Sequence, residues 1–304
     1  MPVGRVIRMV GGFCYINNTQ GDTIVAVSRG KLKLLEDIVV GDLVDYTLIN
    51  SEQGVIERVH SRSSILKRPF VSNVTRVAIV FAHKNPDFNY FLLDRFLVMV
   101  EAYNIKPLIL FNKSDLIDKE NAEKNVEPYR RIGYQVICTS TKSGEGKEEL
   151  LEEISSDATV LAGPSGVGKS ALVNMLAPGY NLETGSVSKK IKRGRQTTRE
   201  VRLLPLPGRT GFIFDTPGFT QLDLDFISMR ELTDCFIEFT KHQGECRFLG
   251  CLHQQEPGCQ VKAAVETGEI DRWRYENFLL FLEELRTIEK RKYLRNRRDR
   301  EKRR

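Results

Sequence analysis

Residues 163–170 read Gly-Pro-Ser-Gly-Val-Gly-Lys-Ser, and this stretch decides the fold of the middle of the chain. It matches the pattern G-x-x-x-x-G-K-[ST] of a phosphate-binding loop. The apolar residues 159–162 before it predict a strand, and residues 169–177 predict a helix. Glycines let the loop turn its backbone N–H groups towards phosphate oxygens, Lys169 adds a positive charge, and the Ser170 hydroxyl suits Mg²⁺. The residues expected to bind nucleotide here are Gly163, Pro164, Ser165, Gly166, Val167, Gly168, Lys169, Ser170 and Ala171.

A second motif, Asp215-Thr216-Pro217-Gly218, follows the predicted strand 211–214. A carboxylate at the end of a strand can hold Mg²⁺ through water, and the N–H of Gly218 can sense the γ-phosphate. Alone, these four residues would fit any turn. After a phosphate-binding loop, they predict the second half of a nucleotide switch.

A third motif, Asn112-Lys113-Ser114-Asp115, follows the predicted strand 108–111. The Asp115 carboxylate can accept hydrogen bonds from N1 and N2 of guanine, a donor pair that adenine lacks on that edge. Asn112 is expected to reach O6 and N7 of the base, and the stem of Lys113 to cover its ring. After the next predicted strand, the base-binding loop is expected to continue with Ser140, Thr141 and Lys142.

The order of these motifs along the chain is unusual. GTPases normally begin with the phosphate-binding loop and end with the base-binding loops. Here the base-binding motifs at residues 112 and 140 precede the phosphate-binding loop at residue 163, the paired threonines at 197–198 and the motif at residue 215. The set is complete but rotated, which predicts a circularly permuted GTPase domain.

Three cysteines and a histidine gather near the C-terminal end, in the spacing Cys246-x₄-Cys251-x-His253-x₅-Cys259. Three thiols and an imidazole suit tetrahedral Zn²⁺, and a full set of protein ligands leaves no open position, so we expect one structural ion. The alternative is three buried cysteines beside a surface histidine. Six cysteines in 304 residues do not form a disulfide framework, and with this cluster they suit a reducing compartment.

The remaining patterns divide the chain into three predicted domains. Five short strands separated by turns predict a small β-barrel at residues 1–68, with an OB-fold as the natural choice and an unspecialised β-domain as the alternative. Strands alternating with helices predict an α/β domain at 69–222, and a helical zinc-binding domain is expected at 223–304. The predicted strands are 5–10, 13–16, 23–27, 42–48, 54–59, 77–82, 108–111, 135–138, 159–162 and 211–214, and the predicted helices are 89–103, 121–132, 143–154 and 169–177.

The net charge of +6 is concentrated in two segments. Residues 189–202 carry seven basic residues and one acidic residue, and residues 286–304 carry eleven and three, so the rest of the chain is net acidic. Such basic segments suit RNA phosphates, although both could be solvated surface and the second could lie on a membrane. The last ten residues lack apolar anchors, and no segment has the length or apolar character of a signal peptide or membrane span.

The chain closely resembles the RsgA (YjeQ-type) family of circularly permuted, ribosome-dependent GTPases. The shared motifs are residues 112–115, 163–170, 194–199, 215–218 and 246–259. The resemblance implies an N-terminal OB-fold, a permuted GTPase domain and a C-terminal zinc domain. It also implies a GTP hydrolase that acts late in maturation of the 30S subunit and is stimulated by that subunit. Together with the basic segments and the cysteine usage, this leads us to expect a cytoplasmic protein that binds 16S rRNA and is released on hydrolysis; we expect a monomer, although the sequence itself does not indicate the oligomeric state.

The chain departs from the family pattern in one position of the first switch. The family has a histidine before the paired threonines, whereas this chain has Gln196, which can also orient water. By analogy, Thr198 is the expected Mg²⁺ ligand, with Thr197 as the alternative. Phe219 follows the motif at residue 215, where many GTPases carry a glutamine, so we expect slow intrinsic hydrolysis. The catalytic set is therefore expected to be Lys169, Thr198, Asp215 and Gly218, with Gln196.

Two other functions fit parts of the sequence. One is a GTPase acting on tRNA or another ribonucleoprotein, since a β-barrel and a basic tail suit any RNA. The other is an RNA-binding module that binds guanine nucleotide without hydrolysing it, against which the complete motif set argues.

Overall fold

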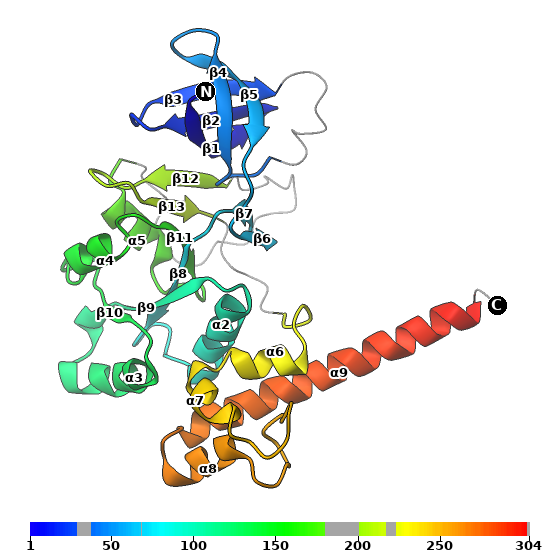
Figure 1. Cartoon of the computed structure of the whole chain (residues 1–304). Helices are drawn as coiled ribbons and strands as arrows, with labels where there is room; N and C mark the ends of the chain where they lie inside the picture. Colours follow the sequence, from blue (N-terminus) through cyan, green and yellow to red (C-terminus); the bar gives the residue numbers. More distant parts are fainter. Residues whose placement is uncertain (29–37, 68, 180–200, 217–222, 303–304) are drawn as a thin grey trace, which may run out of the picture. The chain divides into compact units, whose positions relative to one another are not determined.

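The structure is a computed structural model of the chain, shown in Figure 1. Its described residues form two compact units, of which the second combines the C-terminal part with one helix from the middle of the chain. The first unit comprises residues 1–88, 105–130 and 134–221, and the second comprises residues 89–104, 131–133 and 222–304. The residues that the structure describes are 1–28, 38–67, 69–179, 201–216 and 223–302.

The N-terminal strands close into a barrel, as the sequence predicts. Strands β1 and β2, β2 and β3, and β4 and β5 pair antiparallel, β3 and β5 pair parallel, and β4 returns to β1. Alternate residues such as Val6, Ile16 and Ile56 are fully buried and form its core. Gly4 lies against this core, where a Cβ atom would be 2.3 Å from the side chain of Ile16. The strands are β1 (Val3–Val10), β2 (Phe13–Asn18), β3 (Thr23–Ser28), β4 (Leu43–Leu48) and β5 (Gln53–Val59).

A six-stranded sheet forms the rest of the first unit, in the order β10-β9-β8-β11-β13-β12. All neighbours pair parallel except β12 and β13. Alternate apolar residues of the central strands pack against α4 and α5 on one face, and Phe111 lies on the opposite face. The elements are β8 (Arg76–Ala82), β9 (Lys106–Asn112), β10 (Val136–Cys138), β11 (Ala158–Ala162), β12 (Arg202–Pro205), β13 (Phe212–Asp215), α3 (Lys119–Ile132), α4 (Lys147–Glu153) and α5 (Lys169–Leu176).

Three strands lie outside the sequence-based prediction. The hairpin of β6 (Ile65–Lys67) and β7 (Phe70–Ser72) follows the barrel, and β12 pairs with both β13 and β1. Because β12 meets β1 at Arg202 and Arg8, the barrel and the parallel sheet form one continuous eleven-stranded sheet. The barrel therefore joins the strand pair that carries Asp215 at its end.

The second unit is helical and has an aromatic core. The rings of Phe236, Phe239, Phe278 and Phe281 are fully buried, and the Phe239 and Phe278 ring centroids lie 5.0 Å apart. Figure 1 shows α2 beside α6 and the first part of α9. The elements are α2 (Tyr90–Ala102), α6 (Met229–Asp234), η2 (Ile237–Phe239), α7 (Thr240–Gln243), α8 (Gln260–Thr267) and α9 (Arg272–Lys302), together with η1 (Ser114–Leu116) in the first unit. The predicted helix 89–103 therefore exists, but it packs with the C-terminal part of the chain.

A buried ion cluster ties α2 to this unit. The guanidinium of Arg274 is fully buried, 2.5 Å from the Asp94 carboxylate of α2 and 2.7 Å from that of Glu238. The Asn277 amide donates a second hydrogen bond to Asp94 at 2.7 Å. The Arg274 guanidinium also lies over the Phe236 ring, 4.5 Å from its centroid. Each buried charge therefore has partners, which a buried charge requires.

Among the described residues, no helix combines the length and the apolar character needed to cross a bilayer. The division into domains at residues 68 and 222 stays a prediction.

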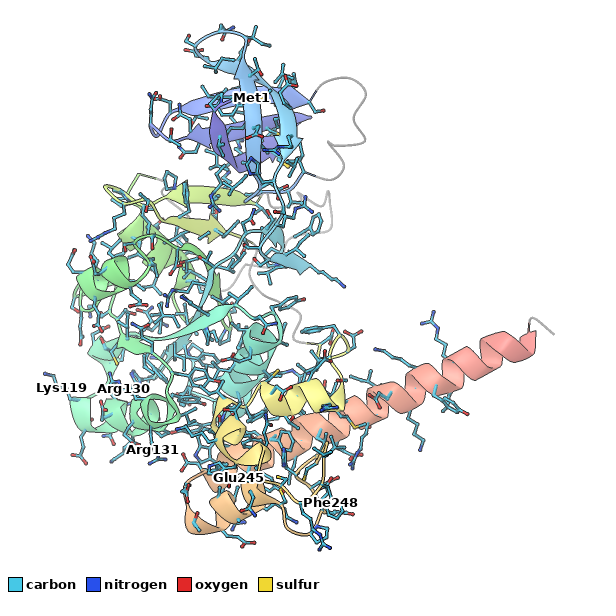
Figure 2. All side chains as sticks on the ribbon, viewed as in Figure 1. Met1, Lys119, Arg130, Arg131, Glu245 and Phe248 are labelled. Atoms are coloured by element: carbon cyan, nitrogen blue, oxygen red, sulfur yellow. The ribbon has the colours of Figure 1, made fainter. Side chains whose placement is uncertain are left out.

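Replacing Arg274 with methionine should strongly destabilise the second unit. Methionine fills similar space but leaves the Asp94 carboxylate buried without its cation, which costs about 3–5 kcal/mol. The control is Arg130→Met, because Arg130 (Figure 2) pairs with the exposed Glu123 and such pairs contribute less than about 1 kcal/mol. Midpoints of urea unfolding followed by circular dichroism would measure both. Equal shifts in the two variants would contradict the importance of the buried cluster.

Candidate active site and metal centre

The phosphate-binding loop connects β11 to α5, as predicted, and its glycines lie where a side chain does not fit. Gly163 has φ +133°, and a Cβ atom there would lie 2.1 Å from the carbonyl oxygen of Val80 on β8. Gly168 has φ +101°, and a Cβ atom there would lie 2.4 Å from the amide nitrogen of Asn112. Glycine is therefore required at both positions by backbone conformation and by space. Ser165 and Ser170 are exposed on this loop.

Lys169 begins α5, and its ammonium donates to the carbonyl oxygens of Gly163 and Pro164 at 2.8 and 2.6 Å. The side chain thus folds back over its own loop. Burial lowers the pKa of the Lys169 ammonium to about 8, because desolvation disfavours the charged form. Phosphate oxygens would offset this desolvation and favour the charged form.

Asn112 ends β9 and bridges two loops. Its amide nitrogen donates to the carbonyl oxygen of Val167 at 2.8 Å, and its amide oxygen accepts a hydrogen bond from Thr139 at 3.2 Å. The side chain is fully buried. In this structure the Asn112 side chain holds the phosphate-binding loop and the strand end after β10 together, and its expected contact with the guanine base stays a prediction.

Lys113 makes a second bridge to the phosphate-binding loop. Its backbone is left-handed, with φ +61°, and its ammonium donates to the carbonyl oxygen of Gly166 at 2.7 Å and to that of Asn85. The segment around Asn85, directly after β8, was not among the residues predicted for the site. The turn sequence Asn85-Pro86 after a predicted strand is the signal that could have pointed to it.

Asp115 and the loop at Ser140 meet, as the sequence predicts. The Ser140 hydroxyl donates to the Asp115 carboxylate at 2.6 Å and accepts hydrogen bonds from the backbone of Lys142 and Ser143 at 3.3 and 3.2 Å. Ser140 therefore orients the carboxylate and shapes its own loop. The contribution of the neighbouring Thr141 to the site stays a prediction.

Glu145 is a further residue at this loop that sequence reasoning missed. The Ser114 hydroxyl donates to the Glu145 carboxylate at 2.6 Å, and the Ser140 N–H donates to the backbone oxygen of Glu145 at 3.1 Å. Glu145 therefore links the two base-binding loops. Nothing in its sequence context, between Gly144 and Gly146, distinguishes it from a surface turn residue.

Of the predicted magnesium ligands, the structure describes Ser170 and Asp215, and these two lie at one edge of the sheet. Val160 of β11 pairs with Phe214 of β13, so Asp215 ends its strand beside the phosphate-binding loop that carries Ser170. A hydroxyl and a carboxylate are oxygen ligands of the kind that Mg²⁺ prefers, and they fit its binding together with nucleotide phosphates. The predicted residues Gln196, Thr197, Thr198, Gly218 and Phe219 lie outside the described part of the chain.

The four predicted zinc ligands come together in the second unit. The ligand atoms of Cys246, Cys251, His253 and Cys259 all lie within 4.8 Å of one another, and all but Cys246 are buried. Burial raises the pKa of the Cys251 thiol to about 12 and raises that of Cys259. Three thiolates would therefore need a compensating cation in this environment.

The spacing of the ligand atoms fits a tetrahedral zinc ion. Zinc–sulfur and zinc–nitrogen bonds of about 2.3 and 2.0 Å place ligand atoms about 3.5–3.8 Å apart. The structure has 4.0 Å between the sulfurs of Cys246 and Cys259, and 3.7 and 3.3 Å from the His253 Nδ1 to these two sulfurs. The cluster could thus hold one zinc ion with no open position for substrate.

The chain matches the sequence models of two families along its length. Residues 55–225 match the RsgA GTPase family, and residues 3–56 match the RsgA N-terminal domain. A small ribosomal subunit biogenesis GTPase RsgA of Shouchella clausii is 40% identical, over 96% of this chain and 100% of its own length. The protein of that name from Caldanaerobacter subterraneus subsp. tengcongensis is 43% identical, over 95% and 98%.

Two solved structures are also similar. YjeQ from Thermotoga maritima has a TM-score of 0.81 and 36% identity, covering 93% of this chain and 98% of that one. YloQ, described as a circularly permuted GTPase, has a TM-score of 0.79 and 34% identity, covering 94% and 96%. The permuted GTPase fold, predicted from the motif order, and the N-terminal barrel, predicted from five short strands, are confirmed.

Nucleotide binding should take up a proton above neutral pH. The Lys169 ammonium has a pKa of about 8 in the free protein, and contact with phosphate should raise it. Affinity for GDP is then constant below that pKa and falls by up to about tenfold per pH unit above it, until the pKa of the complex is reached. Calorimetry at about pH 8.5, in buffers of different ionisation enthalpy, would measure the uptake. The Lys169→Ala variant should lose it, and equal uptake in that variant would assign the proton to another group.

Proposed function

The chain belongs to the RsgA family of GTPases, and from this premise we propose that it is a late assembly factor of the small ribosomal subunit. It hydrolyses GTP to GDP and phosphate. In the proposed cycle it binds the immature 30S subunit through 16S rRNA, is stimulated by that subunit, and is released after hydrolysis. It would act in the cytoplasm as a monomer, with Mg²⁺ on the nucleotide and one structural zinc ion.

The observation that carries the nucleotide assignment is the meeting of three loops at one sheet edge. Asp115 is oriented by Ser140, while Asn112 and Lys113 connect the base-binding motif to carbonyl oxygens of the phosphate-binding loop. A carboxylate held in this way can accept both hydrogens of the guanine N1–N2 edge. Adenine offers no such donor pair, so the carboxylate would lose these two hydrogen bonds when the base covers it, which carries a penalty.

Hydrolysis would use the residues on the phosphate side of this site. The protonated Lys169 would leave its carbonyl partners and neutralise charge on the β- and γ-phosphates. Ser170 and Asp215 would hold Mg²⁺, which when bound would offset the negative charge of the phosphates. Thr198, Gly218 and Gln196 are proposed, from the sequence alone, to complete the switch around the attacking water.

The ribosomal assignment rests on the relatives and on the distribution of charge. The matched relatives are named small ribosomal subunit biogenesis GTPases. The described side chains of α9 from Glu289 to Arg295 are all exposed, and the sequence beyond them is rich in arginine. An exposed basic helix suits the phosphates of RNA. Phe219 in place of a water-positioning glutamine favours a site whose activity depends on the partner.

Turnover should be slow for the protein alone and faster only with the small subunit. The test is steady-state GTP hydrolysis with no addition, with 30S subunits, with 50S subunits and with tRNA. Stimulation of about tenfold or more by 30S alone is expected, because the subunit would order or supply part of the catalytic machinery. Stimulation by tRNA instead would favour action on another RNA, and no turnover in any mixture would favour a binding module.

Removal of residues 286–304 should weaken binding to the 30S subunit and flatten its salt dependence. These residues carry eleven of the 46 basic residues, and the slope of log K against log salt falls by about 0.7–0.9 for each phosphate that the protein no longer neutralises. Pelleting with 30S subunits at several salt concentrations measures both effects. Nucleotide affinity of the truncated protein serves as the control for folding. If the truncated protein had an unchanged slope, residues 286–304 would not be part of the RNA-binding surface.

A further inference from the structure

The loop between the second and last zinc ligands has a strained centre. His253 has φ +56°, a left-handed conformation that is uncommon for a residue with a side chain. Its ring is 1% exposed and directs Nδ1 towards the sulfurs of Cys259 and Cys246 at 3.3 and 3.7 Å. Something in the loop must hold this backbone conformation for the imidazole to point inward.

The carboxylate of Glu256 makes that contact with the backbone. One oxygen accepts a hydrogen bond from the N–H of Leu252 at 3.0 Å, and the other accepts from those of Gln254 and Gln255 at 2.8 and 3.0 Å. The three N–H groups flank His253 on both sides in sequence. A single side chain therefore closes the loop around the ligand, and charge-assisted bonds of this kind are the strong ones.

The charge state of Glu256 is consistent with this role. Burial alone would raise the pKa of the carboxyl, but the hydrogen bonds from its own N–H and from those of Leu252, Gln254 and Gln255 outweigh burial. Together they lower the pKa to about 2. The group is therefore a carboxylate with acceptor sites only, which is the form that three donors require.

A second contact holds His253 from the helical side. The Tyr275 hydroxyl, on α9, donates to the backbone oxygen of His253 at 2.7 Å. The backbone on both sides of the ligand is thus fixed, by Glu256 within the loop and by Tyr275 outside it.

We propose that Glu256 is a positioning residue of the zinc centre, which sets the His253 imidazole in place before the metal binds. Tyr275 supports it from α9. Neither side chain is one of the four candidate metal ligands. The inference rests on the proposed zinc assignment and concerns how the site is prepared. Partners that orient a metal ligand in this way typically change metal affinity by about 10–100-fold when removed.

The test compares two variants of the full-length chain that lose the same charge. Glu256→Gln removes the carboxylate that closes the loop, whereas Glu245→Gln removes an exposed carboxylate directly before the ligand Cys246 (Figure 2). Metal is first removed with a chelator, and Co²⁺ and Zn²⁺ affinities are then measured by competition. We expect a loss of about 10–100-fold for Glu256→Gln and less than about threefold for Glu245→Gln.

The visible spectrum of the Co²⁺-loaded protein reports on the geometry of the metal site and does not change when only the overall stability of the protein changes. At saturating Co²⁺, Glu256→Gln should shift and weaken the d–d bands of the S₃N site, because the imidazole is less well oriented, while Glu245→Gln should match the wild type. GDP affinity of each variant reports on folding of the rest of the chain. If Glu256→Gln does not fold, Tyr275→Phe removes only the hydroxyl and should give a smaller loss of metal affinity in the same direction.

The outcomes separate the two levels of the inference. Wild-type protein that binds no zinc or cobalt would overturn the zinc assignment itself. Wild-type protein that binds one ion, with Glu256→Gln and Glu245→Gln equal to each other in affinity and spectrum, would overturn the positioning role and leave the zinc assignment intact.

Discussion

Close approach of two glycines to neighbouring strands at the phosphate-binding loop is the constraint on which the candidate active site depends. Gly163 lies against the backbone carbonyl of Val80, and Gly168 lies against the side-chain amide of Asn112, at distances that admit no Cβ atom. These approaches bring the ends of β8, β9 and β11 to one edge, where Asn112 and Lys113 bind the loop. Because the edge is set by parallel pairing, the order of the strands along the chain does not matter to it. A permuted sequence can therefore build the same site as an unpermuted one.

Most of the site could be predicted from the sequence because its motifs are local. Each follows a short apolar strand, and the alternation of strands and helices places the carboxyl ends of parallel strands at one edge. What the motifs did not indicate is which contacts each side chain makes within the protein. Asn112 fits a base-binding pattern, but its burial and its bond to Val167 depend on a loop 55 residues away. Glu145 and Asn85 were missed for the same reason, since each acts through a contact distant in sequence.

The fold could be predicted where apolar residues recur with the regular spacing of a strand or a helix. The barrel strands alternate clearly, and their predicted limits agree closely with the structure. The strand β12 was missed because Pro205 and Pro207 interrupt its pattern, and its pairing with β1 could not be read from either segment. The helix α2 was predicted, but its membership of the second unit depends on Asp94, a charged residue within an apolar helix. Only the structure shows that Arg274, almost two hundred residues later, neutralises it.

The place of α2 has a consequence for how the chain divides into modules. The helix lies in sequence between β8 and β9, two strands of the nucleotide-binding sheet, yet it shares its buried charges and aromatic contacts with α9. A fragment ending near residue 222 would keep α2 but lose its partners, exposing Phe91 and leaving Asp94 without Arg274. The C-terminal part with its candidate zinc ligands therefore shares its core with a helix from the middle of the chain. No single cut in the chain therefore separates the two units, because the second includes residues 89–104 as well as 222–304.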